Sequence, residues 1–102
     1  MKIIKVTYTV KSSFVQKNLE NVNKFIADLK RINDPAIRYT AYVGADGKTF
    51  NHFAVYQNDE AQKKLFTLDS FQSFQKQRDE SGLEIAPKIE ELKLASASYN
   101  IF

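Results

Sequence analysis

The sequence predicts one α+β domain in which strands and helices follow the order β-α-β-β-α-β. Three observations predict it. Residues 2–10 alternate between apolar and polar side chains, as a half-buried strand does. Residues 15–32 repeat apolar side chains at three- and four-residue steps, as a helix packed on one face does. Residues 36–57 place β-branched and aromatic side chains on both sides of Asp46-Gly47, as a hairpin does. A length of 102 residues supports one core, so we expect a single domain over residues 1–102.

The first strand and helix have recognisable ends. Ser12 and Ser13 are candidate N-caps, and Ser13 with Gln16 has the spacing of a capping box. The helix should end at Asn33-Asp34-Pro35, because the residue before proline avoids the α region. The inward side of the preceding strand is expected to consist of Ile4, Val6, Tyr8 and Val10.

The hairpin has a predicted register. Asp46-Gly47 readily forms a two-residue type I′ turn. Such a turn would pair Ile37 with Tyr56, Tyr39 with Ala54, Ala41 with His52 and Val43 with Phe50, all on one face that suits a floor beneath helices. The opposite face should be uncovered and should hold Arg38, Thr40, Tyr42, Phe53 and Val55.

The remaining chain predicts a broken helical region and a last strand. Asn58 or Asp59 should cap a short helix, and a break is expected near Thr67. Asp69-Ser70 resembles a second cap, and Ser81-Gly82-Leu83 resembles a helix end with glycine in the left-handed conformation. We expect the last strand within residues 89–101, after an irregular stretch around Pro87.

This order, with short connections and right-handed crossovers, predicts a ferredoxin-like antiparallel sheet with its helices on one face. The other face would remain open. A face that carries Tyr42, Phe53 and Val55 is large enough to attract a second sheet. We therefore expect a homodimer, the commonest symmetric solution.

Composition narrows the functional classes. The net charge of +3 comes from lysines and arginines interleaved with acids, which indicates a solvated surface and no nucleic-acid partner. There is no cysteine and only one histidine, so we expect no metal site. No stretch has the length of a membrane span, and the first residues lack a continuous apolar run. We expect a cytoplasmic protein with no membrane partner.

The stretch from Phe53 to Phe74, FAVYQNDEAQKKLFTLDSFQSF, resembles the antibiotic biosynthesis monooxygenase-like superfamily. Tyr56 stands where that family often has tryptophan, residues 58–61 form the helix start, and Phe71 follows the break. The resemblance implies a dimeric α+β barrel with a small-molecule cavity between each sheet and its own helices. It also implies activity like that of cofactor-independent monooxygenases of aromatic or quinol-like compounds.

The resemblance does not extend to the haem-degrading members of the family. Gln75 occupies the place of their haem-ligating histidine, and Leu65 the place where many members have histidine or tryptophan. Val6 or Thr7 falls where the haem group has an asparagine. We therefore expect no cofactor. A monooxygenase role stays open, because such enzymes mainly position a substrate that is itself reactive toward oxygen.

His52 is the candidate catalytic residue. Ala41 and Ala54 are short and leave room for a ligand beside it, and a neutral imidazole can serve as a base toward an acidic phenol or enol. The alternative is a core histidine that hydrogen-bonds Tyr39 or Tyr56. The candidate ligand-binding residues are Tyr8, Tyr39, Tyr56, Leu65 and Phe71.

Two other functions remain open. The same fold could be a non-catalytic homodimeric module whose cavity is filled by side chains. It could also be an RNA-recognition domain, although Lys48–Phe53 has threonine where that motif needs glycine and histidine where it needs an aromatic residue. An enclosed pocket at His52 with converging polar groups would favour the enzyme or binder, and a close-packed interior would favour the filled module.

Overall fold

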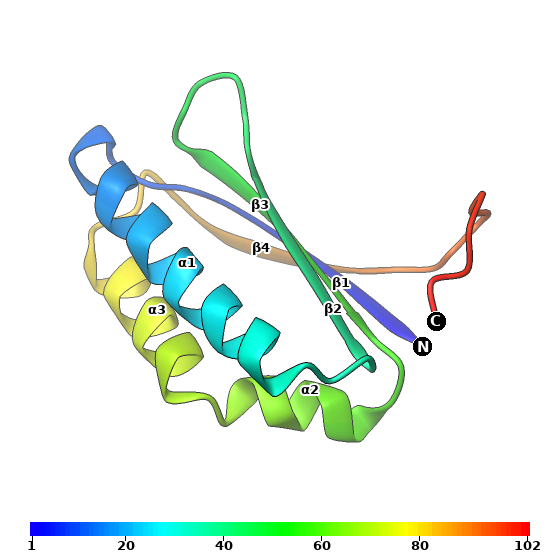
Figure 1. Cartoon of the computed structure of the whole chain (residues 1–102). Coiled ribbons are helices and arrows are strands. Elements are labelled where there is room, and N and C mark those ends of the chain that lie inside the picture. Colours follow the sequence, from blue (N-terminus) through cyan, green and yellow to red (C-terminus); the bar gives the residue numbers. More distant parts are fainter.

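The structure, a computed structural model of residues 1–102, is a four-stranded antiparallel sheet with helices on one face (Figure 1). The strands lie in the order β2-β3-β1-β4. This confirms the predicted ferredoxin-like α+β fold. The elements are β1 (Lys2–Thr9), a 3₁₀ turn (Ser12–Phe14), α1 (Val15–Ile32), β2 (Ile37–Val43), β3 (Thr49–Tyr56), α2 (Asp59–Phe66), α3 (Asp69–Glu80) and β4 (Ile85–Leu92).

The helix ends are partly as predicted. Asn33 ends α1 in the left-handed conformation, with φ of 54°, and its N–H donates to the Leu29 carbonyl. Asn58 caps α2, since its side chain accepts the Ala61 N–H at 2.9 Å. The expected caps of the other two helices are wrong, because α1 and α3 begin after Phe14 and Leu68 with no side-chain cap bond.

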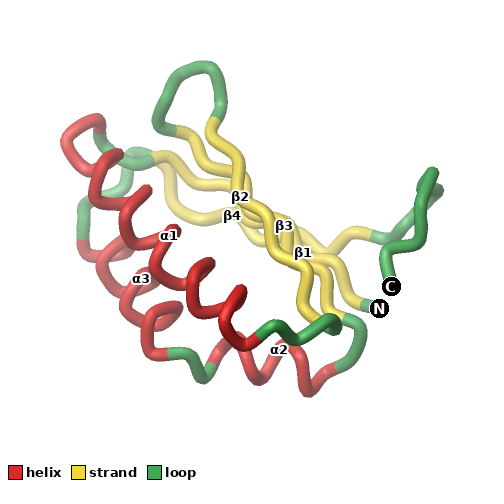
Figure 2. Tube along the Cα trace, viewed as in Figure 1, coloured by secondary structure: helices red, strands yellow, loops and turns green.

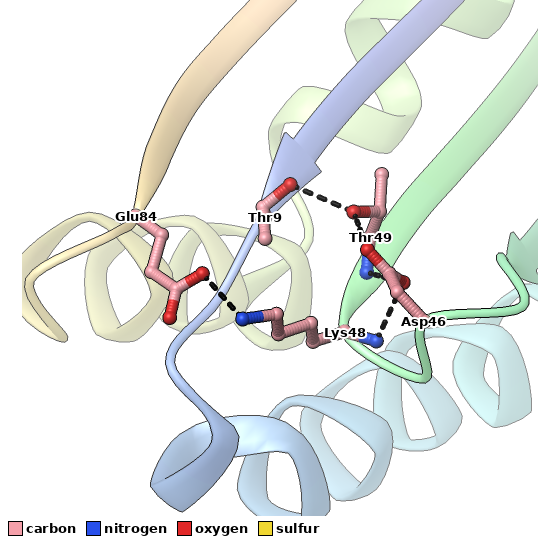
Figure 3. Close-up of polar contacts among 5 residues, drawn as sticks. All are labelled: Thr9, Asp46, Lys48, Thr49 and Glu84. Carbon is pink, nitrogen blue, oxygen red and sulfur yellow. Dashed lines mark hydrogen bonds and ion pairs between the residues drawn. The ribbon is translucent and has the colours of Figure 1, made fainter.

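The β2–β3 hairpin has the predicted register but a different turn. All four predicted pairs, from Ile37 with Tyr56 to Val43 with Phe50, are present. The turn is not type I′, because only Gly47 has positive φ. Instead, the Gly47 N–H donates to the Gly44 carbonyl, and the Asp46 side chain accepts the N–H groups of Lys48 and Thr49 (Figure 3).

A cluster of polar side chains connects the β2–β3 loop to β1 and to the start of β4. Asp46 also accepts the Thr49 hydroxyl, and Thr49 in turn contacts the Thr9 hydroxyl on β1 at 2.8 Å (Figure 3). The Lys48 ammonium pairs with Glu84, just before β4, at 2.8 Å. The hydrogen bonds from Thr49 and the Lys48 N–H lower the pKa of Asp46 to about 2. Asp46 therefore holds the loop as a carboxylate.

The last strand lies earlier in the chain than predicted. β4 spans Ile85–Leu92 and pairs with β1, whereas residues 93–102 have no regular secondary structure. Pro87 lies inside the strand, where the register with β1 shifts between Thr7 and Thr9. β4 is an edge strand and its irregularity coincides with the proline, so the missing N–H breaks no regular ladder.

The two faces of the sheet differ as predicted. Phe50, His52, Ala54 and Tyr56 alternate along β3 as buried residues beneath the helices. On the opposite face Tyr42 is 57% exposed. The C-terminal segment lies on that side, away from the helices (Figure 2). None of the helices has the length and apolar character needed to cross a membrane.

Candidate functional site

A cavity of about 260 Å³ lies between the sheet and helices α2 and α3. Its floor comes from all four strands, with Ile89 as the contribution of β4, and its far wall from the two helices, so it occupies the place that the resemblance implies. The polar lining residues are Lys2, Tyr39, His52, Tyr56, Gln62 and Gln75, and the apolar ones are Ile4, Val6, Ala54, Phe66, Phe71 and Ile89.

His52 lines this cavity and is held by two tyrosines. Its side chain is nearly inaccessible to solvent, at 2% exposure. Nε2 lies 2.8 Å from the hydroxyl of Tyr8 on β1, and Nδ1 lies 2.7 Å from the hydroxyl of Tyr39 on β2. Both ring nitrogens are therefore engaged, and neither is free to accept a proton directly from a ligand.

Asn18 adds one hydrogen bond of known direction, because its side-chain amide donates to the Tyr8 oxygen at 2.9 Å. The directions of the two bonds to His52 depend on which ring nitrogen carries the proton. With the proton on Nδ1, Tyr8 donates to Nε2 and Nδ1 donates to the Tyr39 oxygen. At the end of the chain the Tyr39 hydroxyl keeps its own proton, and Tyr39 belongs to the cavity wall.

Burial keeps the titratable side chains of this hydrogen-bond chain, Tyr8, His52 and Tyr39, uncharged near neutral pH. Desolvation lowers the pKa of His52 to about 4, and the nearby positive charge of Arg78 adds to this effect. Desolvation raises the pKa of Tyr8 to about 12 and raises that of Tyr39 further above its usual value. Tyr39 is therefore a neutral phenol and not a phenolate.

Arg78 on α3 packs over Tyr8, at the end of the hydrogen-bond chain that does not line the cavity. Its guanidinium carbon lies 5.2 Å from the ring centre of Tyr8 and 5.3 Å from that of Phe74, although the residue is only 8% exposed. Its Nε donates to Asp79 at 3.0 Å. Sequence reasoning missed both Arg78 and Asn18, because a polar residue on a helix is most simply taken as solvent-facing.

The predicted ligand-binding residues divide into two groups. Tyr39, Tyr56 and Phe71 line the cavity. Tyr8 lies behind His52, and Leu65 is fully buried in the core, so neither reaches the cavity. On α2 the cavity is lined instead by Gln62 and Phe66, which share a face one residue on from that of Ala61 and Leu65.

A larger hollow of about 530 Å³ lies on the opposite face of the sheet. It separates the open face from Tyr99 and Ile101 of the C-terminal segment. Arg38 already donates its Nε to the Ile101 carbonyl at 2.6 Å. None of the residues that line this hollow is buried, whereas His52 and Tyr56 of the smaller cavity are 2% and 3% exposed, so we regard the smaller cavity as the candidate site. No group of three or more His, Cys, Asp or Glu side chains gathers anywhere in the structure.

Comparison with solved structures gives the same architecture. The chain aligns over 94% of its length with all of an antibiotic biosynthesis monooxygenase, at a TM-score of 0.75 and 8% identity. The chain has the fold of the antibiotic biosynthesis monooxygenases. SnoaB from Streptomyces nogalater, a cofactor-independent oxygenase, matches with a TM-score of 0.70 and 13% identity over 97% of this chain and 98% of its own.

A further structure with this monooxygenase fold, Rv0793 from Mycobacterium tuberculosis, has a TM-score of 0.78 and 16% identity, covering 96% of this chain and 98% of its own. No protein-family profile and no curated protein matches the sequence. The likeness to the monooxygenases therefore lies in the fold.

The lining of this cavity does not fit haem degradation, as the sequence resemblance already indicated. Val6 and Gln75 both line it, at the positions where the resemblance to haem-degrading proteins would require asparagine and histidine. An isopropyl group cannot form the hydrogen bonds of an asparagine, and an amide does not replace an imidazole ligand to iron. His52 cannot take that role either, because both of its ring nitrogens are hydrogen-bonded.

Proposed function

We propose that the protein binds a small aromatic molecule of the phenol or quinol class in the cavity and oxidises it with molecular oxygen, without a cofactor. Two features of the cavity support this. Its aromatic and aliphatic walls suit a flat ring, and its few polar groups suit the oxygen substituents of such a ring. The likeness in fold to a cofactor-independent oxygenase points in the same direction.

The observation that carries the proposal is the hydroxyl of Tyr39. Tyr39 is part of the cavity wall, and its hydroxyl is fixed by a 2.7 Å hydrogen bond to His52. A fixed neutral donor of this kind stabilises negative charge that develops on a ligand oxygen. Tyr39 would therefore contact the ligand, whereas His52 would orient Tyr39 and would act only indirectly.

The chemistry requires little from the protein. A phenol that gives its proton to solvent water becomes electron-rich at a ring carbon and can reduce oxygen there. A carbon–oxygen bond forms, the peroxide O–O bond breaks, and water leaves, so that ArH(OH) and O₂ give a quinone and H₂O. The four electrons come from the substrate. A hydrogen bond from Tyr39 to the substrate oxygen would favour the phenolate form that starts this sequence.

Oxygen uptake in the presence of 1-naphthol tests this proposal, with 1,4-naphthoquinone as the expected product. Tyr39→Phe removes the hydroxyl and keeps the ring, and we expect it to lower turnover about 100-fold. Tyr42→Phe is the matched control, because it removes a hydroxyl from the same strand on the opposite face. Equal turnover in the wild type and the folded Tyr39→Phe protein would overturn the role of Tyr39.

The alternative function is a non-catalytic module. The cavity is open enough to hold a ligand and has converging polar groups, which favours a binding function over a filled interior. Thermal stabilisation by phenols or quinols without any oxygen uptake would identify a binding protein. No stabilisation by any of these compounds would favour the structural module.

We also propose that the protein forms a homodimer through the open face of its sheet. On this face Tyr42 is 57% exposed, and Phe53 and Val55 are only partly covered. In sedimentation equilibrium we expect a dimer, which Phe53→Glu converts to a monomer. Asn23→Glu, on the outer surface of α1, should remain dimeric. A wild-type monomer would contradict the proposal.

RNA binding has less support in this geometry. Bases would stack on aromatic residues on the open face of the two central strands. Phe53 is the only aromatic residue there, since Phe50 and His52 point toward the helices.

A further inference from the structure

The cavity has a polar group at each end and an apolar middle. Lys2 is paired with Tyr56 at one end of the floor, and Val6 is paired with His52 at the other. The two pairs are four residue steps apart along the strand, which corresponds to about 13 Å between their Cα atoms. Ala54 lies between the two ends, and its short side chain leaves the floor flat.

The end at Lys2 is the charged one. Lys2 is the only lining residue with a charged side chain at neutral pH, and no carboxylate lines the cavity. Its Nζ donates one hydrogen bond, to the Gln62 side-chain oxygen at 3.2 Å. Because an ammonium has three protons and Lys2 takes part in none of the ion pairs of the structure, two of these protons are available to a ligand.

Lys5, on the same strand, faces the other side of the sheet, so only Lys2 places an ammonium group at the cavity. Lys5 lies on the open face, where it pairs across the sheet with Phe53 and Glu90. Lys2 instead points to the helix side, is partly buried and reaches α2. A partly desolvated cation that has no carboxylate partner favours the binding of an anion beside it.

We infer that the ligand is an aromatic acid, with a fixed anionic group such as a carboxylate held by Lys2 and Gln62 and a phenolic or carbonyl oxygen held by Tyr39. Tyr39 is paired with Ala54, and its hydroxyl reaches the His52 end through the hydrogen bond to Nδ1, so a ligand held by both Lys2 and Tyr39 has to lie along the floor, as a fused-ring system can. This inference rests on the proposed binding function and adds the substrate class to it. A neutral phenol would satisfy only one end of the cavity.

The test compares 6-hydroxy-2-naphthoate with its methyl ester, which keeps the ring and the hydroxyl but removes the charge. In calorimetric titration of the wild-type protein, we expect the acid to bind about tenfold or more tightly than the ester. Lys2→Met should remove this preference by weakening only the acid, and Lys2→Arg should retain it. Lys5→Met is the matched control and should leave both affinities unchanged.

The outcomes separate the two proposals. Equal binding of acid and ester to the wild type would overturn the inference and leave the cavity as a binding site. Equal weakening of both compounds by Lys2→Met, in a variant with wild-type melting temperature, would do the same. If neither compound stabilises or binds the wild-type protein, both the inference and the proposed function fail. The wild-type comparison needs no variant, so misfolding of Lys2→Met cannot hide the answer.

Discussion

The two faces of the sheet use neighbouring residues of the same strands in opposite ways. On β3, His52 and Ala54 are 2% and 5% exposed beneath the helices, whereas Phe53 between them faces the open side and is only partly covered. On β2, Tyr39 forms part of the cavity wall and Tyr42 is 57% exposed. The covered face contains a cavity that its side chains leave unfilled. The open face presents an apolar surface that the helices of the same chain do not cover.

The largest expected effect is a difference in the free energy of unfolding between variants on the two faces. Phe25 on α1 is fully buried and packs at 5.1 Å against the rings of both Tyr39 and Phe71. Phe25→Ala should lower the free energy of unfolding by about 3–5 kcal/mol, because it leaves a cavity in the core. Phe53→Ala on the open face should cost clearly less when urea unfolding is measured at low protein concentration. Equal losses would show that the open face is as well packed as the covered one.

The second effect is a dependence on pH that belongs to the covered face. The pKa of His52 is about 4 in the folded protein and 6.5 when unfolded, so between these values the unfolded chain binds more protons. The contribution of His52 to the free energy of unfolding should therefore be fully present above pH 6.5. The free energy of unfolding should fall by about 3 kcal/mol as the pH drops to 4.

Urea unfolding measured from pH 7.5 to 4.5 checks this dependence. The control is His52→Gln, which has no titrating ring and should lose the slope within this window while keeping any slope due to carboxylates. The same slope in both proteins would contradict a buried neutral imidazole.

The smallest effect concerns the loop that joins β2 and β3 and supports both faces equally. Gly47 has φ of 75° and open space around its Cα, so Gly47→Ala should cost about 1 kcal/mol through backbone strain alone. Gly44→Ala is the matched control, because a side chain there would meet its neighbours at ordinary contact distances of 3.6 Å or more and would need no positive φ. Equal thermal stability of the two variants would contradict the turn described above.

Sequence patterns predicted the sheet well, because alternation and loop length determine register. The hairpin pairs survive a wrong turn type, since Gly44 and Thr49 remain opposite each other whichever turn lies between them. The turn itself was mispredicted because Asp46 uses its carboxylate to hold the loop and does not adopt positive φ. The last strand was misplaced because Pro87 argues against a strand, and its edge position is a property of the sheet as a whole.

The candidate site was less predictable than the fold. His52, Tyr39 and Tyr56 could be chosen because the hairpin register places them on one face. Gln62 and Gln75 could not, because helical periodicity identifies the core face and does not show where a polar neighbour borders a cavity. Lys2 was missed because a lysine near a strand end is most simply a solvated residue.

The central claim is that ligands enter the covered face and not the open one, and amide chemical shifts during titration with 6-hydroxy-2-naphthoate test it most directly. We expect the largest shifts at Ala54, Tyr56 and Phe71, around the cavity, and little change at Tyr42 and Tyr99. Shifts confined to Tyr42, Tyr99 and their neighbours would place the ligand in the hollow beneath the C-terminal segment and would contradict the account.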